Sequence, residues 1–263
     1  MGEKTHRGTI ALQEAEVISH QAYPEQQYIL RLHAPRCAEL ARPGSFAHLS
    51  CGPELPMRRP LSIMRASAEA GWVDFLYKVV GLGTGTLATR KQGETVSILG
   101  PIGNPFHPNP KRPRTLLIGG GVGIPPMIFL AETLHQQQST WQPLVLMGSE
   151  IPFPFTQRPS EIMVPGIPDG TIAAMPLLED WGMPSRLASL QGYPGCYEGH
   201  VTELARHWLN SLDKQRRLEV EIFACGPIPM LAAAVQLARE YELPCQVSLE
   251  EFMACGVGGC AGC

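Results

Sequence analysis

The sequence has little excess charge and lacks a long uninterrupted apolar run, and each absence excludes a class of function. Its 263 residues include 24 acidic and 21 basic side chains, which leaves a formal net charge of −3. No long run of either sign is present, so we expect neither a nucleic-acid surface nor an anionic-membrane surface. The most apolar stretch, residues 115–131, is broken by glycines and prolines, and we therefore expect no membrane span.

The first residues lack the apolar core of a secretion signal, and the sequence shows no internal repeat or low-complexity block. We therefore expect a cytoplasmic protein whose eight cysteines stay reduced. Clustered cysteines then indicate a metal site more than a disulfide framework. Because 44% of the residues are hydrophobic, the chain can bury a sizeable core, and its length favours one large or two ordinary domains.

The first hundred residues have the pattern of short strands separated by turn residues. We predict strands at residues 10–18, 27–33, 45–51, 61–65, 72–80 and 95–99. This spacing is typical of an antiparallel barrel or sandwich. One short helix near residues 86–90 is expected to interrupt it.

The pattern changes after a proline-rich stretch at residues 105–113. Further strands are predicted at residues 115–118, 143–147, 171–174 and 218–224, and helices at 127–136, 201–212 and 230–241. Strands that alternate with helices predict a parallel sheet covered on both faces. The predicted fold is thus an antiparallel β barrel followed by an α/β parallel-sheet domain. Residues 153–197 match no motif.

The sharpest feature is a cysteine run near the end of the chain, formed by Cys255, Cys260 and Cys263. A Cys-x4-Cys-x2-Cys spacing lets one tight, glycine-rich loop direct three sulfurs inward, as plant-type 2Fe-2S ligation requires. A zinc site and a set of adventitious thiols on a flexible tail stay open as alternatives. A plant-type cluster needs a fourth cysteine. Either the sequence is truncated, or Cys245 or another residue supplies the ligand, or the cluster is absent.

A second motif begins with Arg59-Pro60-Leu61-Ser62 and continues with Tyr77-Lys78-Val79 and a glycine-threonine turn that contains Gly83 and Thr84. An arginine offers a rigid fork for a pyrophosphate, a serine offers a hydroxyl for a ring nitrogen, and the turn offers backbone N–H groups. Each piece alone is a weak signal, and a surface arginine beside a turn is common. Their joint order predicts a cradle for a flavin dinucleotide.

Two glycine turns follow predicted parallel strands. Gly119, Gly120, Gly121 and Gly123 lie between a buried strand and a helix, a pattern that can bind a nucleotide pyrophosphate or can be a plain structural turn. Cys225-Gly226-Pro227 ends a later strand. Ligands sit outside the carboxyl ends of such strands, so we place Cys225 where a nicotinamide would meet the flavin. A small buried thiol is the alternative.

With these motifs in this order, the chain resembles the ferredoxin-NADP reductase superfamily, in which a flavin barrel precedes a nicotinamide domain. The segments at residues 99–106 and 250–256 resemble more narrowly the electron-transfer subunits of class 1B dihydroorotate dehydrogenases. The resemblance implies an FAD-binding barrel at residues 1–109, an NAD-binding domain at 110–244 and a 2Fe-2S segment at 245–263. It also implies a hetero-oligomer with an FMN-containing catalytic subunit.

The resemblance further implies the roles of individual residues. The cluster ligands carried over are Cys255, Cys260 and Cys263, and Ser62 and Cys225 are assigned to the reacting centre. The FAD contacts it implies are Arg59, Pro60, Leu61, Ser62, Tyr77, Lys78, Val79, Gly83 and Thr84. Glu150 follows the second parallel strand, where a carboxylate can bind a ribose diol and repels a 2′-phosphate, so it favours NAD over NADP. A glutamate in a loop can also be merely solvated.

The sequence therefore predicts an electron carrier from dihydroorotate oxidation, through 2Fe-2S and FAD, to NAD. One alternative is a diaphorase-type subunit of a hydrogenase or of a ferredoxin-linked transhydrogenase, which would share every motif named. Another is a non-enzymatic redox sensor or assembly factor that keeps the fold without electron transfer.

Overall fold

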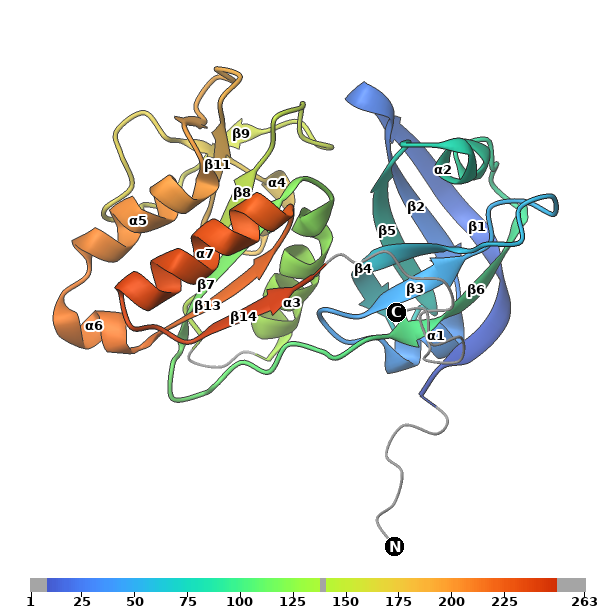
Figure 1. Cartoon of the computed structure of the whole chain (residues 1–263), viewed down its shortest axis with the longest axis horizontal. Coiled ribbons are helices and arrows are strands. Elements are labelled where there is room, and N and C mark those ends of the chain that lie inside the picture. The colour runs from blue at the N-terminus through green and yellow to red at the C-terminus, as the bar shows by residue number, and fades with distance from the viewer. Residues whose placement is uncertain (1–8, 138–140, 250–263) are drawn as a thin grey trace, which may run out of the picture. The chain divides into compact units, whose positions relative to one another are not determined.

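The computed structural model describes residues 9–137 and 141–249, which form two compact units. The first unit ends at Pro105 and the second begins at Phe106. In the chain course drawn in Figure 1, strands alone fill most of the first unit, whereas strands and helices alternate in the second.

The first unit is a closed antiparallel barrel, which confirms the predicted fold of this half. The strands follow one another around the barrel in the order β1-β2-β5-β4-β3-β6. Their bounds are β1 Ala11–Tyr23, β2 Gln27–His33, β3 Phe46–Leu49, β4 Arg59–Ser67, β5 Trp72–Lys78 and β6 Thr95–Ile102. Closure pairs every edge strand, so that no row of backbone groups is left open.

Alternating side chains fill the barrel, as the period of a strand requires. Leu30 and Leu32 of β2 and Phe75 of β5 are fully buried. Helix α1 (Pro35–Leu40) packs against β4, β5 and β6. The second short helix, α2 (Leu82–Leu87), begins four residues before the predicted range of 86–90, and η1 (Pro24–Gln26) connects β1 to β2.

The second unit is a six-stranded parallel sheet, again as predicted, in the order β12-β11-β8-β7-β13-β14. The strands are β7 Arg114–Gly120, β8 Leu144–Gly148, β11 Ser185–Ser189, β12 Tyr197–Glu198, β13 Val220–Cys225 and β14 Cys245–Ser248. The helices are η2 Gly121–Gly123, α3 Ile124–Gln136, α4 Pro176–Asp180, α5 Val201–Ser211, α6 Lys214–Leu218 and α7 Ile228–Glu240. Figure 1 shows α5 and α7 on the near face of this sheet and α3 on the other.

One predicted strand does not join the parallel sheet. Residues 171–174 contain only β10 (Ala173–Ala174), which pairs antiparallel with β9 (Arg158–Pro159). The third parallel strand is β11 instead, and its five residues are all buried. Its sequence, SRLAS, has no apolar run, and the strand can still be buried because other polar groups of the fold bond to its side chains. Ser185 Oγ accepts from Met175 N at 3.1 Å, and Arg186 Nη2 donates to the carbonyl of Ile162 at 2.6 Å.

The limits of the units also differ from the predicted boundaries. The Phe106 ring packs edge-on against Phe223 of β13 at 5.6 Å, and Asn109 N donates to Glu221 Oε2 at 2.8 Å. These contacts place residues 106–109 in the second unit rather than at the end of the first. In the same way β14 lies in the sheet, although the predicted C-terminal segment began at Cys245. Across the residues that the structure describes, no helix has both the length and the apolar character needed to cross a membrane.

Candidate functional site

A cavity of about 570 Å³ lies in the second unit, where β7, β8, β11 and β13 end. Open parallel sheets bind their ligands at this edge because loops and helix starts meet there. Four of its lining residues were predicted as nucleotide contacts: Gly120, Gly121, Glu150 and Pro227. The others come from the strand ends and from the starts of α5 and α7: Gly148, Ser149, Ile151, Ala188, Ser189, Leu190, Gly199, His200, Val201, Thr202, Pro229, Met230 and Ala233.

The glycines at the end of β7 and in the turn after it are required by close packing. A Cβ atom at Gly123 would lie 2.4 Å from the backbone of Cys225 and Gly226, and one at Gly119 would lie 3.0 Å from Ile124 Cα. Gly121 has a φ of +54°, in the region that favours glycine. The turn after β7 therefore touches the turn after β13, and both border the cavity.

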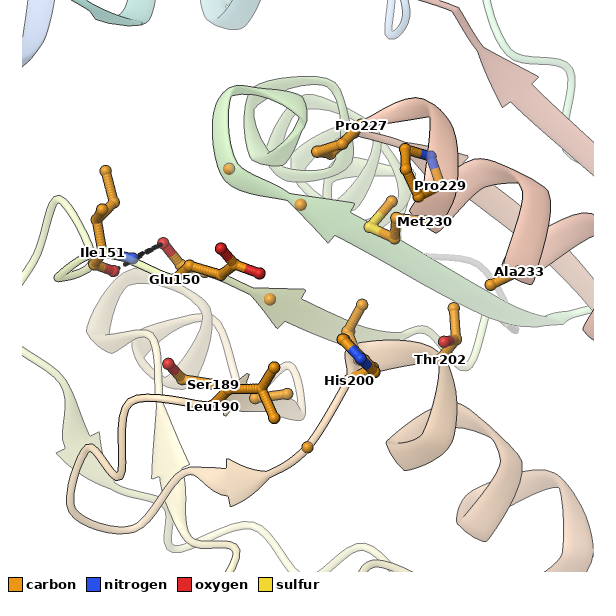
Figure 2. A pocket seen from close by; sticks show the side chains of 17 residues that line it. Glu150, Ile151, Ser189, Leu190, His200, Thr202, Pro227, Pro229, Met230 and Ala233 are labelled. Carbon is orange, nitrogen blue, oxygen red and sulfur yellow. Dashed lines mark hydrogen bonds between the residues drawn. The ribbon is translucent and has the colours of Figure 1, made fainter.

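Met230 of α7 fills the space beside Gly120, at the end of β7, and Gly226, which follows β13. A Cβ atom would lie 2.4 Å from Met230 Sδ if it were added at Gly120, and 2.6 Å from Met230 Cε if it were added at Gly226. Figure 2 shows Met230 with Pro227 and Pro229 on one wall of the cavity. On this wall, the flexible thioether of Met230 lies next to the backbone of Gly120 that a ligand would contact.

Glu150 and the start of α5 line other parts of the cavity (Figure 2). Glu150 is exposed and directly follows Ser149, whose hydroxyl donates to the carbonyl of Ile151 at 2.7 Å. His200 begins α5 with a capping box, in which its N–H donates to Glu203 Oε2 at 2.8 Å. The cavity is thus lined both by the Glu150 carboxylate and by the amino end of α5, an 11-residue helix. The free N–H groups at the start of a helix favour an anion.

The structure places Cys225 beside the cavity but does not expose its thiol. Cys225 is the last residue of β13 and is fully buried. Gly226, with a φ of +158°, turns the chain away before Pro227 reaches the cavity wall. The predicted part of Cys225 in the reacting centre stays a prediction.

In the first unit, Arg59 and the turn of α2 come together. A Cβ atom at Gly83 would lie 2.5 Å from Arg59 Nε, so the guanidinium lies directly on this glycine. Arg59 Nη1 donates to the carbonyl of Met57 at 2.9 Å. Within the described part of the chain, Arg59 Nε and Nη2 make no hydrogen bond to a protein group. These N–H groups fit the pyrophosphate of a dinucleotide.

Thr84 and Tyr77 have side chains that are engaged inside the protein. Thr84 Oγ1 accepts from Val80 N at 3.0 Å and donates to the carbonyl of Gly81 at 3.3 Å, which holds the turn. Tyr77 is 2% exposed, and its hydroxyl lies 2.9 Å from His20 Nε2. Burial, followed by the charge interaction with Tyr28, raises the pKa of the Tyr77 phenol. A contact of Tyr77 with a ligand would therefore use its backbone.

The remaining predicted flavin contacts lie on β4 and at the end of β5. Pro60, Leu61 and Ser62 of β4 are half-buried, as are Lys78 and Val79. Val79 N donates to the carbonyl of Gln26 at 3.0 Å, so this backbone group already serves the barrel. A ligand role for these residues stays a prediction.

The cysteine run Cys255, Cys260 and Cys263 lies outside the described residues. Its weak fourth candidate, Cys245, is described: it lies on β14 and packs against the apolar core beneath α5 and α7. Burial, followed by Glu221, raises the pKa of the Cys245 thiol to about 11, which disfavours the thiolate that a metal needs. Residues 9–137 and 141–249 hold no group of three His, Cys, Asp or Glu side chains suited to a metal ion.

The sequence of the chain is similar to those of known electron transfer subunits. Electron transfer subunits of dihydroorotate dehydrogenase B (NAD(+)) from Bacillus caldolyticus and from Geobacillus kaustophilus are each 32% identical over 261 residues. Each match covers 97% of this chain and 89% of the relative. The chain belongs to this family. It is therefore an electron transfer subunit in an NAD-linked oxidoreductase, and such a subunit implies a catalytic partner.

Solved structures show the same fold for this electron transfer subunit. An NADH-dependent reduced ferredoxin-NADP oxidoreductase superposes with a TM-score of 0.74 at 24% identity, covering 95% of this chain and 80% of that one. The ferredoxin reductase in carbazole 1,9a-dioxygenase superposes with a TM-score of 0.70 at 21% identity, covering 91% and 69%. These likenesses confirm the ferredoxin reductase-like fold. A scan of protein-family models found none that matches.

Sequence reasoning missed several residues that line the cavity in this electron transfer subunit. Ser189 belongs to the strand that was not predicted, and Met230 was taken only as the start of a helix. His200 and Thr202 carried a usable signal, because Glu203 stands three residues after His200 in the pattern of a capping box. That pattern would have placed the start of α5 and its N–H groups.

Proposed function

We propose that this subunit takes electrons from a partner that oxidises dihydroorotate and passes them through a 2Fe-2S cluster and FAD to NAD. The observation that carries the proposal is the nearly full-length likeness to subunits of NAD-dependent dihydroorotate dehydrogenase B. The cavity at the carboxyl ends of the parallel strands supports the NAD part of the proposal. Arg59 on the turn of α2 supports the FAD part.

The residues present fit both dinucleotides. The backbone at Gly120 and Gly121 and the amino end of α5 would hold the pyrophosphate of NAD, and Glu150 would accept from a ribose diol. Arg59 would hold the pyrophosphate of FAD over Gly83, while Thr84 keeps the turn closed. When bound, FAD supplies the exchange between one-electron and two-electron transfer. The protein groups bind, orient and tune the cofactors.

The cluster part of the proposal depends on sequence alone. Cys255, Cys260 and Cys263 have the ligand spacing and would hold the 2Fe-2S cluster, which when bound would supply one-electron transfer between the partner's FMN and FAD. Cys245 is unsuited to be the fourth ligand because its thiol is half-buried against the core with a raised pKa. We therefore propose that the fourth thiolate is not Cys245.

The rival assignment is a diaphorase-type subunit of a hydrogenase or of a ferredoxin-linked transhydrogenase. It would use the same barrel and the same cavity. The relatives favour dihydroorotate oxidation, because at 32% identity they extend over 97% of the chain.

The test is reconstitution with the catalytic subunit. We expect dihydroorotate to drive NAD reduction only when purified catalytic subunit is added to the flavin- and cluster-loaded chain. Failure of coupling in a fully loaded complex would exclude the pyrimidine assignment. NAD reduction with hydrogen or reduced ferredoxin instead would support the rival, and a folded chain without flavin or iron-sulfur absorbance would support a non-enzymatic sensor.

A further inference from the structure

A second cavity, of about 660 Å³, lies in the second unit at the opposite edge of the parallel sheet. Arg114 and Leu144, the first residues of β7 and β8, line it, whereas Gly120 and Gly148 at the other ends of these strands line the first cavity. At about 3.3 Å per residue, seven residues of β7 separate the two cavities by roughly 20 Å. The second cavity is therefore a separate site, and its volume is in the range of small-molecule pockets.

Indole rings dominate this second cavity. Three of the four tryptophans of the chain line it, namely Trp141, Trp181 and Trp208. Trp208 is 6% exposed, whereas Trp141 and Trp181 are only half-buried. Large aromatic surfaces that face an open cavity are available for ring stacking.

The second cavity carries little net charge. Among the described residues that line it, only Arg114 and His135 are basic and none is acidic. Arg114 Nε lies 3.0 Å from Glu219 Oε2, a carboxylate outside the lining that offsets its charge. The His135 ring stacks on Trp181 with centroids 5.6 Å apart and an interplanar angle of 12°. A strongly charged ligand would gain little here.

The rim of the second cavity comes from residues 163–165, which do not line the first cavity. Met163 is 89% exposed, and it lies beside Val164 and Pro165 on the rim. Buried Arg186 anchors this rim by donating to the carbonyl of Ile162 at 2.6 Å. The floor is apolar and buried, with Leu134 and Met183 at 3% and 4% exposure. The cavity thus has a packed floor, aromatic walls and a thioether that can close over a ligand.

We propose that this cavity binds a planar heteroaromatic ring that is uncharged or carries one negative charge. Stacking on the exposed indole surface of Trp141 and against the His135–Trp181 ring pair provides the affinity, and Arg114, His135 and Gln142 provide donors for the ring edge. The site is independent of the nucleotide cavity and of the assignment to dihydroorotate oxidation.

The test uses the loaded full-length protein with Trp72→Phe, excited where tryptophan but not tyrosine absorbs, so that the three tryptophans of the second cavity are the only tryptophans left to emit. Uracil, orotate and adenine are added in turn with NAD at saturation, so that the first cavity is filled. We expect at least one ring to shorten the tryptophan emission lifetime saturably at millimolar concentration or below. Trp181→Leu should weaken that binding roughly fivefold or more, as the loss of an aromatic pair implies.

A second variant keeps the proposal testable if Trp181→Leu folds poorly. His135 is exposed, so His135→Leu should fold normally and still weaken binding by removing the stacked ring and a donor. Lack of a saturable response to all three rings overturns the proposal. Equal binding in the wild type and in His135→Leu and Trp181→Leu overturns it too, because the rings would then bind elsewhere.

Discussion

At the residue scale, Arg59 and Tyr77 have different parts in the proposed flavin site. Arg59 lies half-buried on Gly83, and its Nε and Nη2 groups donate to no acceptor among the described residues, whereas the Tyr77 phenol is buried against His20. We expect Arg59→Ala to weaken FAD retention roughly 10- to 100-fold, because charge-assisted hydrogen bonds are lost. Tyr77→Phe should keep its FAD and lose about 1 kcal/mol of unfolding free energy.

The ratio of flavin to protein absorbance, together with thermal unfolding, checks this pair of variants. Each variant is the control of the other, since one should change cofactor content and the other stability. Flavin loss in Tyr77→Phe would show that the phenol contacts the cofactor, contrary to the geometry.

A substitution of Glu150 tests the preference of the cavity for NAD over NADP. Its exposed carboxylate lines the cavity after β8 and would repel the 2′-phosphate of NADP. We expect Glu150→Ser to lower the KM for NADP about tenfold and to raise the KM for NAD. Steady-state kinetics with both nucleotides measure the change. Glu161→Gln, an exposed glutamate outside the cavity, is the control. An unaltered preference in Glu150→Ser would exclude the assigned role.

At the element scale, the turn after β7 works because it can approach the turn after β13. Gly123→Ala would place a Cβ atom against the backbone of Cys225 and Gly226, which cannot move away cheaply. We expect a loss of about 1–3 kcal/mol in unfolding free energy. Gly120→Ala meets the flexible end of Met230 and, at 3.2 Å, Pro227 Cδ, both of which are side-chain atoms, and it should cost less. Chemical denaturation of both variants gives the comparison. Equal losses would contradict the packing argument.

Hydrogen bonds of the Gln246 side chain hold strand β14 at the edge of the sheet. Gln246 Nε2 donates to Glu221 Oε1 at 2.9 Å and to the carbonyl of His107 at 2.8 Å, and Gln246 Oε1 accepts from His107 N at 3.0 Å. Glu221 is 4% exposed. Gln246→Ala should therefore cost about 1–3 kcal/mol, since a buried carboxylate loses a donor.

Hydrogen exchange should detect this loss first in β14 and at residue 107. Gln236→Ala, on an exposed position of α7, is the matched control and should leave exchange unchanged. Identical protection of β14 in both variants would contradict this role of the Gln246 hydrogen bonds. The Gln246 hydrogen bonds also hold the last described strand before the cysteine run, which begins a few residues after Ser248.

At the scale of the whole molecule, two units with separate ligands should respond separately. A ligand that binds only the folded state at 100 times its Kd stabilises it by about 2.7 kcal/mol. We expect NAD to slow hydrogen exchange at the end of β8 and the start of α5 in the second unit. The barrel strands β2 and β5 should respond to FAD instead. Protection by NAD of the barrel but not of β8 and α5 would contradict the assignment of the cavity.

Much of the site could be predicted from local sequence. A recognisable strand or turn marks three parts of the site: the glycines that follow the apolar run of β7, Glu150 after β8, and Arg59 at the start of β4. Ser189, His200 and Met230 could not be assigned in this way, because they reach the cavity from segments far apart in the chain. Only the parallel register, with Leu117 opposite Val145 and Phe223, brings those segments to one edge.

The sequence by itself determined the order of the two folds, because strand and helix periodicities depend only on neighbouring residues. It also determined the spacing of the cysteine run and the family. Tertiary structure decided what periodicity cannot encode: that β11 is the third parallel strand, that the Tyr77 phenol is buried, and that three tryptophans face one cavity. These outcomes depend on which distant groups satisfy each other's hydrogen bonds and fill each other's space, and only the packed chain specifies that.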